Sequence, residues 1–299
     1  MLKMLFILAG SLLLFINAEH LTAIVPNYRN PFKDQFQEEW KQPHAPFIIH
    51  TIPKCGVHQL QRLVQLIVPE DIACAGCHTL LKEEFHKKQW IMRTHESYSE
   101  KAMGFVLAAN YKMVAIVRDP RDALISHLHY MRLYGEKPNA PLQRDFFSVG
   151  ADFDSLPMNE QIKVLIVGND RTPSYIRYYK KRLGFALCGF PLVVKYEHLQ
   201  PSKTNQRLEK TVKKIATYLR VRLSEDHLAF ILQNCYNNQV AYAGITPPKD
   251  GKDMMGGIVY KRASTGNWKA FLTEEHKDLL KALIGEDLIR LGYEKDYGW

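Results

Sequence analysis

The sequence predicts an α/β protein with a mostly parallel central sheet flanked by helices. Short apolar runs typical of buried strands alternate along the chain with amphipathic runs of helical spacing. Such alternation needs crossover connections, which set the strands parallel and cover both faces of the sheet with helices. The 299 residues suffice for one large domain or two small ones. We expect a single domain, and the chain contains no internal repeat.

The first half of the chain contains three expected strands, each followed by an expected helix. FIIHT is short and apolar, and KMVAIVRD is the clearest buried-strand pattern in the chain. A proline directly after KMVAIVRD stands where proline favours the first turn of a helix. The expected strands cover 47–51, 90–95 and 112–119, and the expected helices cover 57–68, 99–110 and the residues from Pro120 onward.

The second half predicts one further strand among several helices. PLVVKYEHL forms the strand, and leucines with helical spacing stripe the last helix. The stretches 136–156 and 240–266 lack periodicity, and the second is rich in Gly and Pro. The expected elements are two helices within 157–187 broken near Gly168 and Pro173, a strand over 191–199, helices over 208–219 and 223–236, and a final helix over 280–291.

The N-terminus predicts export rather than a folded element. Residues 1–18 have a short basic start, an uncharged apolar core and a small residue before Glu19, which is typical of a secretory signal. An uncleaved N-terminal anchor is the alternative, and it would be the only contact with a membrane. The expected location is the secretory pathway or outside the cell, with the cytoplasmic face as the alternative. Residues 19–46 form an irregular lead-in, and the domain covers 47–299.

Composition favours an anionic ligand. Lys and Arg exceed Asp and Glu by nine, and the isoelectric point is about 9.2. A basic field concentrates anions, although a soluble basic protein is the simpler interpretation. The chain has no basic-aromatic stripe, so we expect no nucleic-acid partner. Five cysteines in a chain of this length do not make a disulfide scaffold, and no carboxylate cluster indicates a metal.

The loop after the first strand has the parts of a phosphate site. Gly56 lets the backbone approach an anion, the helix beginning at Val57 presents N–H groups, and Lys54 adds a charge. Many strand-to-helix turns carry a lysine, so the loop alone is weak support. It lacks the Gly-x-x-x-x-Gly-Lys-Ser/Thr spacing, which argues against a nucleotide kinase.

Other candidate residues also follow predicted strands, where ligands bind on parallel sheets. Arg118 begins a stretch that continues to Ser126, and arginine suits bidentate phosphate contacts. His95 ends the run Arg-Thr-His, and histidine is the usual general base near neutral pH. Each has a plainer interpretation as a surface turn or a structural histidine. The further candidates are Arg93, Tyr196, and Lys261 and Arg262 in the basic loop YKRASTGNWK.

Together, these motifs resemble the sulfotransferase family that uses 3′-phosphoadenosine 5′-phosphosulfate (PAPS), from about Phe47 to the C-terminus. The first loop is similar to the family's Pro-Lys-Ser-Gly-Thr-Thr-Trp, and VRDPRDALISHL is similar to its 3′-phosphate segment. RTH resembles the Lys-Thr-His of the cytosolic-type enzymes, and YEHL resembles Tyr-Glu-Asp-Leu. KRASTGNWK resembles Arg-Lys-Gly-x-x-Gly-Asp-Trp-Lys.

The resemblance implies a P-loop-kinase-like fold and in-line transfer of a sulfuryl group from PAPS to an acceptor hydroxyl. It assigns His95 as the base and Lys54 to the bridging oxygen. Sugar, steroid, phenol, lipid and tyrosine hydroxyls all stay open as acceptors. The implied nucleotide contacts are Lys54, Cys55, Gly56, Val57 and His58 in the first loop, Arg93 at the sulfonate, Arg118 and Ser126 at the 3′-phosphate with Lys261 and Arg262 closing over it, and Tyr196.

The first loop departs from the family pattern. Cys55, Val57, His58 and Gln59 stand where the family has Ser, Thr, Thr and Trp, so two hydroxyl donors and the adenine-stacking ring are missing. Backbone N–H groups and the His58 side chain could substitute. The alternative is a non-catalytic nucleotide-binding relative. The family's dimer motif is also incomplete, so the sequence predicts no oligomeric state.

A different motif predicts a rival function. Cys74-x-x-Cys77-His78 has the spacing of covalent c-type haem attachment, with the histidine as an iron ligand. A zinc site that also uses His86 is a second option, and a loop with two thiols or one disulfide is the plainest.

Overall fold

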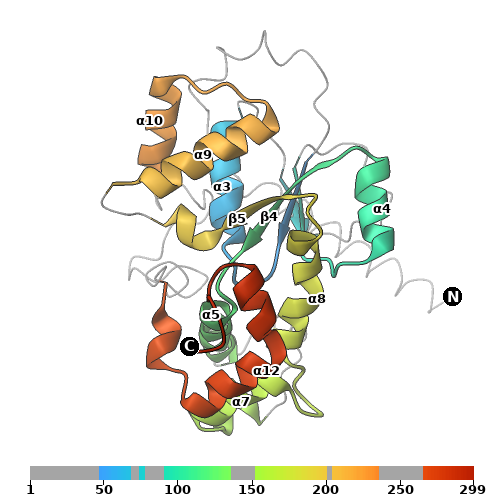
Figure 1. Ribbon diagram of the computed structural model, residues 1–299, viewed down its shortest axis with the longest axis vertical. Coiled ribbons are helices and arrows are strands. Elements are labelled where there is room, and N and C mark those ends of the chain that lie inside the picture. The colour runs from blue at the N-terminus through green and yellow to red at the C-terminus, as the bar shows by residue number, and fades with distance from the viewer. Residues whose placement is uncertain (1–46, 69–73, 78–90, 136–151, 201–203, 236–264) are drawn as a thin grey trace, which may run out of the picture.

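Five parallel strands form the centre of the protein (Figure 1). This computed structural model describes residues 47–68, 74–77, 91–135, 152–200, 204–235 and 265–299. The signal or anchor, the lead-in and most of the Gly- and Pro-rich stretch lie outside these ranges, so their assignments stay predictions. None of the described helices is long and apolar enough to cross a membrane.

The strands occur in the spatial order β2-β3-β1-β4-β5, and every pairing is parallel. The predicted sheet with helices on both faces is therefore confirmed. The central strand β1 pairs with β3 on one side and with β4 on the other. The strands are β1 (Phe47–Thr51), β2 (Cys74–Cys77), β3 (Ile91–Thr94), β4 (Lys112–Val117) and β5 (Leu192–Lys195).

Before the C-terminal region, the described ranges contain nine helices that follow the predicted alternation, seven α-helices flanking the sheet or its carboxyl edge and two short 3-10 turns. They include α3 (Val57–Ile67), α4 (Glu100–Ala108), α5 (Pro120–Gly135), α7 (Met158–Val167), α8 (Tyr175–Leu187), α9 (Gln206–Leu219) and α10 (Glu225–Asn234). The short turns are η2 (Phe153–Ser155) and η3 (Tyr196–Leu199). The chain ends with the 3-10 turn η5 (Asn267–Ala270) and the helix α12 (Glu274–Arg290).

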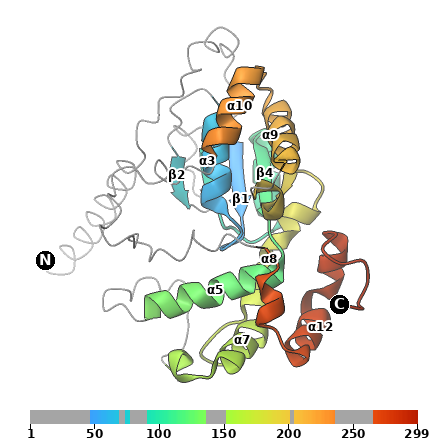
Figure 2. The same cartoon turned by 90° about the vertical axis from the view of Figure 1, so that its left-hand side faces the viewer.

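Each face of the sheet has its own core. Alternate residues of a strand point to opposite faces, and Val114 packs with α3, α9 and α10 while Ala115 packs with α5, α8 and α12. Near the amino ends of the strands, α4 covers the second face through a smaller cluster that includes Met113. Figure 2 shows α3, α9 and α10 beside the strands, with α5, α7 and α12 gathered beyond their carboxyl ends.

Two elements differ from the predictions. The strand expected over 191–199 ends at Lys195, because the chain turns into η3 and the Tyr196 ring packs against Gly56. The stretch Cys74–Cys77 forms the edge strand β2, which its small residues do not predict.

Gly56 has a conformation and a neighbour that exclude a side chain. Its φ of 91° lies in the left-handed region, and an added Cβ would lie 2.4 Å from Cδ2 of Tyr196. Gly104 in α4 is the opposite case, because an added Cβ there would meet nothing within 4 Å.

We therefore expect Gly56→Ala to lower the free energy of unfolding by about 2 kcal/mol or more, through backbone strain and the clash with Tyr196. Gly104→Ala is the matched control and should raise it by about 0.5–1 kcal/mol, since alanine favours a helix interior. Urea denaturation of both variants measures the difference. Equal stability of Gly56→Ala and the wild type would contradict the strained geometry.

Candidate active site

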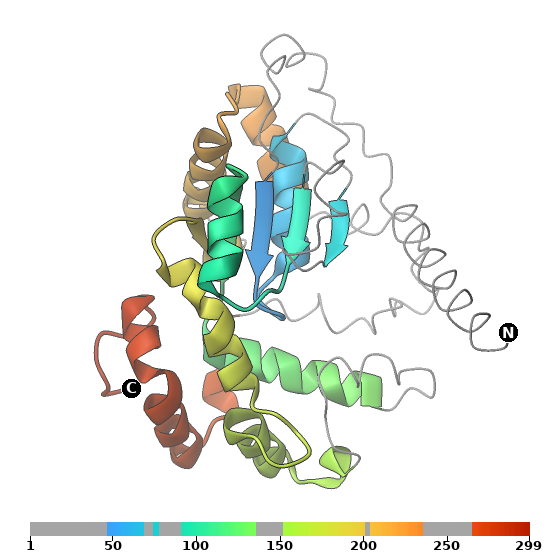
Figure 3. The ribbon, with the colours of Figure 1, turned by 90° about the vertical axis from the view of Figure 1, so that its right-hand side faces the viewer.

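The predicted site residues follow three neighbouring strands. Lys54 follows β1, His95 follows β3 and Arg118 follows β4. Because these strands are adjacent and parallel, their carboxyl ends meet at one edge of the sheet. Figure 3 shows this edge facing α5 and α8. The helices after β1 and β3 pack on opposite faces, and ligands bind at such a switch in chain direction.

The loop between β1 and α3 is shaped to receive an anion. Lys54 and Gly56 both have left-handed backbone, with φ of 72° and 91°. Gly56 is the N-cap of α3, so no side chain caps this helix, and its first turn contains no acidic residue. By contrast, Ser99 and Ser174 cap α4 and α8 with their hydroxyls. The positive end of the α3 dipole is thus left for a ligand.

Arg118 holds this loop in place. Its Nη1 donates to the Lys54 carbonyl at 3.0 Å, and its guanidinium lies 4.5 Å from the centroid of the Tyr196 ring. The Tyr179 hydroxyl donates to the Arg118 carbonyl at 2.6 Å. The structure therefore brings together three predicted residues: Lys54, Arg118 and Tyr196.

The surroundings of Lys54 destabilise its charged form relative to the neutral amine. Its Nζ lies 4.0 Å from the centroid of the Tyr130 ring. Burial, and to a smaller extent the positive charge of Arg118, together lower the pKa of Lys54 to about 7. An anion bound in the loop would favour the charged amine.

His95 has a defined tautomer. Its Nδ1 lies 2.6 Å from the Thr51 carbonyl oxygen, which can only accept, so Nδ1 carries the proton and Nε2 the lone pair. Burial lowers the pKa of His95 to about 4, opposed by the hydrogen bond to Thr51 and assisted by the charges of Arg182 and Arg93. The imidazole is therefore neutral at pH 7 and can accept a proton.

His58 and Arg93 belong to the same group of side chains. Burial lowers the pKa of His58 to about 4, and the next largest causes are the charges of Arg93, Lys54 and His95. This half-buried histidine on the first turn of α3 stands where the family has a hydroxyl. A neutral imidazole retains one N–H donor for an anion.

Ser126 lies on the face of α5 that also carries Asp122 and Tyr130, two residues that contact other parts of the site. Asp122 and Tyr130 stand four residues before and after it, so all three share a helical face. Asp122 accepts from the backbone N–H groups of Gly266 and Trp268 at 2.6 and 3.1 Å. The Trp-Lys loop is thus anchored at Asp122, one helical turn before Ser126. Lys261 and Arg262 of that loop lie outside the described residues.

Cys55 has a different place from its neighbours. The residue is fully buried, its N–H donates to the Ile52 carbonyl at 3.0 Å, and burial raises the pKa of its thiol to about 12. The thiol packs in the core between the sheet and α5. Contacts with an anion would therefore come from Lys54, Gly56, Val57 and His58 rather than from this side chain.

The haem and zinc alternatives stay predictions. The segment Cys74–Cys77 is the edge strand of the sheet. His78 and His86 lie outside the described residues.

A model of the sulfotransferase domain matches residues 44–292, most of the chain. The chain belongs to the sulfotransferase domain family. This confirms the predicted family and, with it, the predicted class of PAPS-dependent sulfotransferase. The prediction of a P-loop-like α/β fold is confirmed as well.

Individual relatives are distant. A flavonol sulfotransferase-like protein from Flaveria bidentis is 23% identical over 288 residues, with 86% of this chain and 85% of the relative covered. The structure of mouse sulfotransferase SULT7A1 complexed with PAP has a TM-score of 0.56 at 16% identity and covers 89% of this chain and 91% of its own. Retinol dehydratase in complex with androsterone and inactive cofactor PAP has a TM-score of 0.50 at 16% identity, with 87% and 86% covered. At these identities the solved structures show the fold alone.

Several residues that support the sulfotransferase site were not predicted from the sequence. The carboxylate of Glu197 accepts from the Asp119 N–H and from the Tyr293 hydroxyl, both at 2.9 Å. Asp119 in turn pairs with the buried Arg121 at 2.7 Å. The sequence signal for Glu197 was its place in the YEHL motif, whereas Tyr293 is close only in space.

The pKa of Lys54 can be tested directly. In NMR spectra of the protein with 13C-methylated lysines, we expect one signal to titrate near pH 7, far below the usual value near 10.4. Lys54→Arg should remove this signal and so assign it. Arg118→Gln should move its pKa upward, though not fully, because burial is the larger cause. A Lys54 signal that titrates near pH 10 would refute the buried position.

Proposed function

We propose that this sulfotransferase transfers a sulfuryl group from PAPS to an acceptor hydroxyl by in-line displacement, with His95 as the general base. The observation that carries the proposal is the 2.6 Å hydrogen bond from His95 Nδ1 to the Thr51 carbonyl. It leaves the lone pair on Nε2, and a pKa of about 4 keeps the ring neutral at physiological pH. A neutral, oriented imidazole is what removal of a hydroxyl proton requires.

His95 takes the hydroxyl proton onto Nε2 as the acceptor oxygen forms its bond to sulfur. The bond from sulfur to the bridging oxygen of the nucleotide breaks, and the products are the sulfated acceptor, PAP and a proton. Lys54 neutralises the negative charge that grows on the bridging oxygen, a fixed cation aimed at the transition state. Arg93 helps to hold the sulfonate oxygens.

The residues of the first loop fit the 5′-phosphosulfate despite the missing hydroxyls. Backbone N–H groups at the start of α3 are donors that any sequence supplies, and Gly56 keeps the approach open. His58 adds a side-chain donor, and Lys54 adds the charge. A polyanion bound here raises the pKa of Lys54, so the protein takes up a proton as the nucleotide binds at pH 8.

Arg118 and Ser126 are the residues that we assign to the 3′-phosphate of the nucleotide. Arg118 is already oriented by the Lys54 carbonyl and the Tyr196 ring, so little side-chain entropy is lost when it pairs with a phosphate. Ser126 shares a helical face with Asp122, the anchor of the Trp-Lys loop. From the family resemblance we infer that Lys261 and Arg262, which precede the anchored part of that loop in sequence, contact the 3′-phosphate.

Replacing the base tests the chemical step. His95→Ala should lower turnover by about two to four orders of magnitude while the affinity for PAP changes little. PAP release measured with a panel of phenols, alcohols and sugars gives the rates, and calorimetry gives the affinity. His129→Ala on α5, whose ring faces Phe271, is the control for loss of an imidazole. Unchanged turnover in His95→Ala would contradict the assignment of His95 as the general base.

Replacing Arg118 tests the nucleotide site. Calorimetric titration of the wild-type protein should show micromolar binding of PAP and much weaker binding of ADP and AMP. Arg118→Ala should weaken PAP binding by about 10- to 100-fold and AMP binding far less, since AMP lacks the 3′-phosphate. The variant's melting temperature must be compared, because Arg118 also holds the Lys54 carbonyl. Equal affinity for PAP in the variant would refute the role. Wild-type PAP binding without turnover on any acceptor would favour the non-catalytic alternative.

A further inference from the structure

A second guanidinium lies beside the proposed base. Arg182 on α8 donates from Nε to the His95 carbonyl at 2.6 Å and from Nη1 to the Tyr178 carbonyl at 3.2 Å. Its guanidinium also lies only 3.3 Å from the centroid of the Tyr178 ring. These contacts hold the group in one orientation, half-buried at the carboxyl edge of the sheet.

Arg182 has more charge and more donors than its neighbours use. An arginine has five N–H donors; Nε and Nη1 of Arg182 bond to backbone carbonyls, and the Tyr178 side chain is a further partner. Glu96 acts on Arg182 through its charge, but no ion pair joins Arg182 to a carboxylate in the described ranges, whereas the buried Arg121 pairs with both Asp119 and Glu294. A half-buried guanidinium without an ion pair is costly and is typical of a site for an anion.

The position of Arg182 assigns this anion to the acceptor rather than to the nucleotide. The charges that act on His58 in the first loop are Arg93, Lys54 and His95. Arg182 instead acts on His95 and on His50, the fully buried histidine whose Nε2 lies 3.1 Å from the Glu96 carbonyl. On α8, Arg182 lies seven residues, about two helical turns, after Tyr175, whose hydroxyl donates to the Pro53 carbonyl of the phosphate loop at 2.7 Å, so Arg182 stands farther from that loop than Tyr175 does. The acceptor must approach His95 from a side that the nucleotide does not occupy.

The same charges act on the chemical step. His95 becomes an imidazolium when it takes the hydroxyl proton, and Arg182 and Arg93 both disfavour that cation. A negative group on the acceptor, paired with Arg182, would offset this repulsion at the moment the proton moves.

We propose that the acceptor of this sulfotransferase carries an anionic group, such as a carboxylate, near its hydroxyl, and that Arg182 binds it. The inference rests on the proposed function for the place of the acceptor. It narrows the five open acceptor classes to acidic members of each, such as hydroxy-carboxylates or uronic acid sugars. The remaining Nη donors of Arg182 suit the two oxygens of a carboxylate.

Matched pairs of acceptors test the proposal. The first pair is 4-hydroxyphenylacetate and its methyl ester, and the second is methyl glucuronide and methyl glucoside. Binding to the PAP complex is measured by NMR saturation transfer, and sulfuryl transfer from PAPS is measured as kcat/KM. We expect the anionic member of at least one pair to be preferred by about tenfold or more in both measurements. The two pairs distinguish a phenolic from a sugar acceptor.

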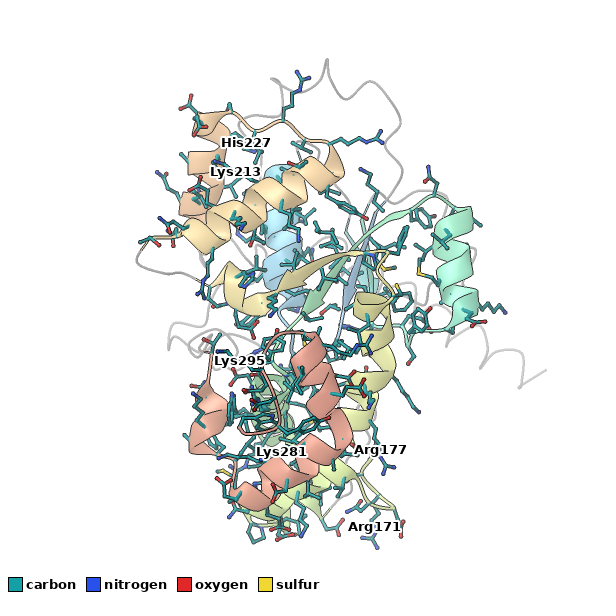
Figure 4. All side chains as sticks on the ribbon, viewed as in Figure 1. Arg171, Arg177, Lys213, His227, Lys281 and Lys295 are labelled. Carbon is teal, nitrogen blue, oxygen red and sulfur yellow. The ribbon has the colours of Figure 1, made fainter. Side chains whose placement is uncertain are left out.

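Variants of α8 assign the preference to Arg182. Arg182→Gln keeps a donor for the His95 carbonyl but removes the charge, and it should reduce the anionic-to-neutral ratio to near one. Arg182→Lys should retain part of the ratio. Arg177→Gln is the control, because Arg177 is exposed on the same helix and points outward at the edge of the molecule in Figure 4, so its ratio should equal that of the wild type.

The outcomes separate this inference from the proposed function. Transfer that occurs but favours the neutral member of both pairs, or a ratio that Arg182→Gln leaves unchanged, overturns the inference and leaves the function standing. Absence of transfer to any acceptor counts against the function, and the binding ratio then still decides the inference. Equal binding of the two members in both pairs to the PAP complex overturns the inference.

Discussion

The double pairing of β1 is the constraint on which the site depends. With β3 on one side and β4 on the other, the register sets Thr94 opposite His50 and Ile116 opposite Thr51. The three loops that follow therefore leave the sheet within a few residues of each other. Thr51 is the last residue of β1, and its carbonyl accepts a hydrogen bond from the Nδ1–H of His95, which follows β3. The end of the central strand therefore orients the histidine that follows the neighbouring strand. A slip of one residue in either pairing would turn these side chains to the other face.

Behind this edge, the buried Arg121 is held by charged and aromatic partners. Arg121 pairs with Asp119 and Glu294, and its guanidinium lies 4.0 and 4.5 Å from the centroids of the Trp268 and Trp299 rings. Buried charges are tolerated only when paired and hydrogen-bonded, so this network couples the segment after β4 to the C-terminal residues. By contrast, no ion pair joins Lys54 or Arg182 to a carboxylate in the described part of the chain, and Glu96 acts on Arg182 only through its charge. The difference separates a residue that supports the fold from residues that we propose to bind ligands.

Most of the fold was predictable from the sequence, because the spacing of apolar residues along the chain indicates most of the strands and helices. β1 and β4 are apolar and short, and α9 carries its buried residues at helical spacing. The strand ends then indicated Lys54, His95 and Arg118, since parallel strands bring their carboxyl ends together. The edge strand β2 was missed because Cys-Ala-Gly-Cys has no apolar run. Its place depends on pairing with β3, a contact between distant parts of the chain.

The supporting residues of the site were harder to find for the same reason. Tyr130, Arg182 and Tyr293 act on partners 76 or more positions away, or on groups that only the folded chain brings near. The spacing of residues along the sequence does not indicate contacts between positions so far apart. The burial of Cys55 was also hidden, because its motif position suggested a ligand contact while its side chain fills the core.

The left-handed backbone of Lys54, with a φ of 72°, has a consequence for laboratory evolution. A non-glycine residue in this region costs about 1–2 kcal/mol, which asparagine and glycine largely avoid. Selection for thermal resistance alone would therefore favour Asn or Gly at position 54 and discard the cation. Stability and the proposed catalytic role of Lys54 therefore compete at this one backbone position, and a programme to stabilise this enzyme must select for turnover at the same time.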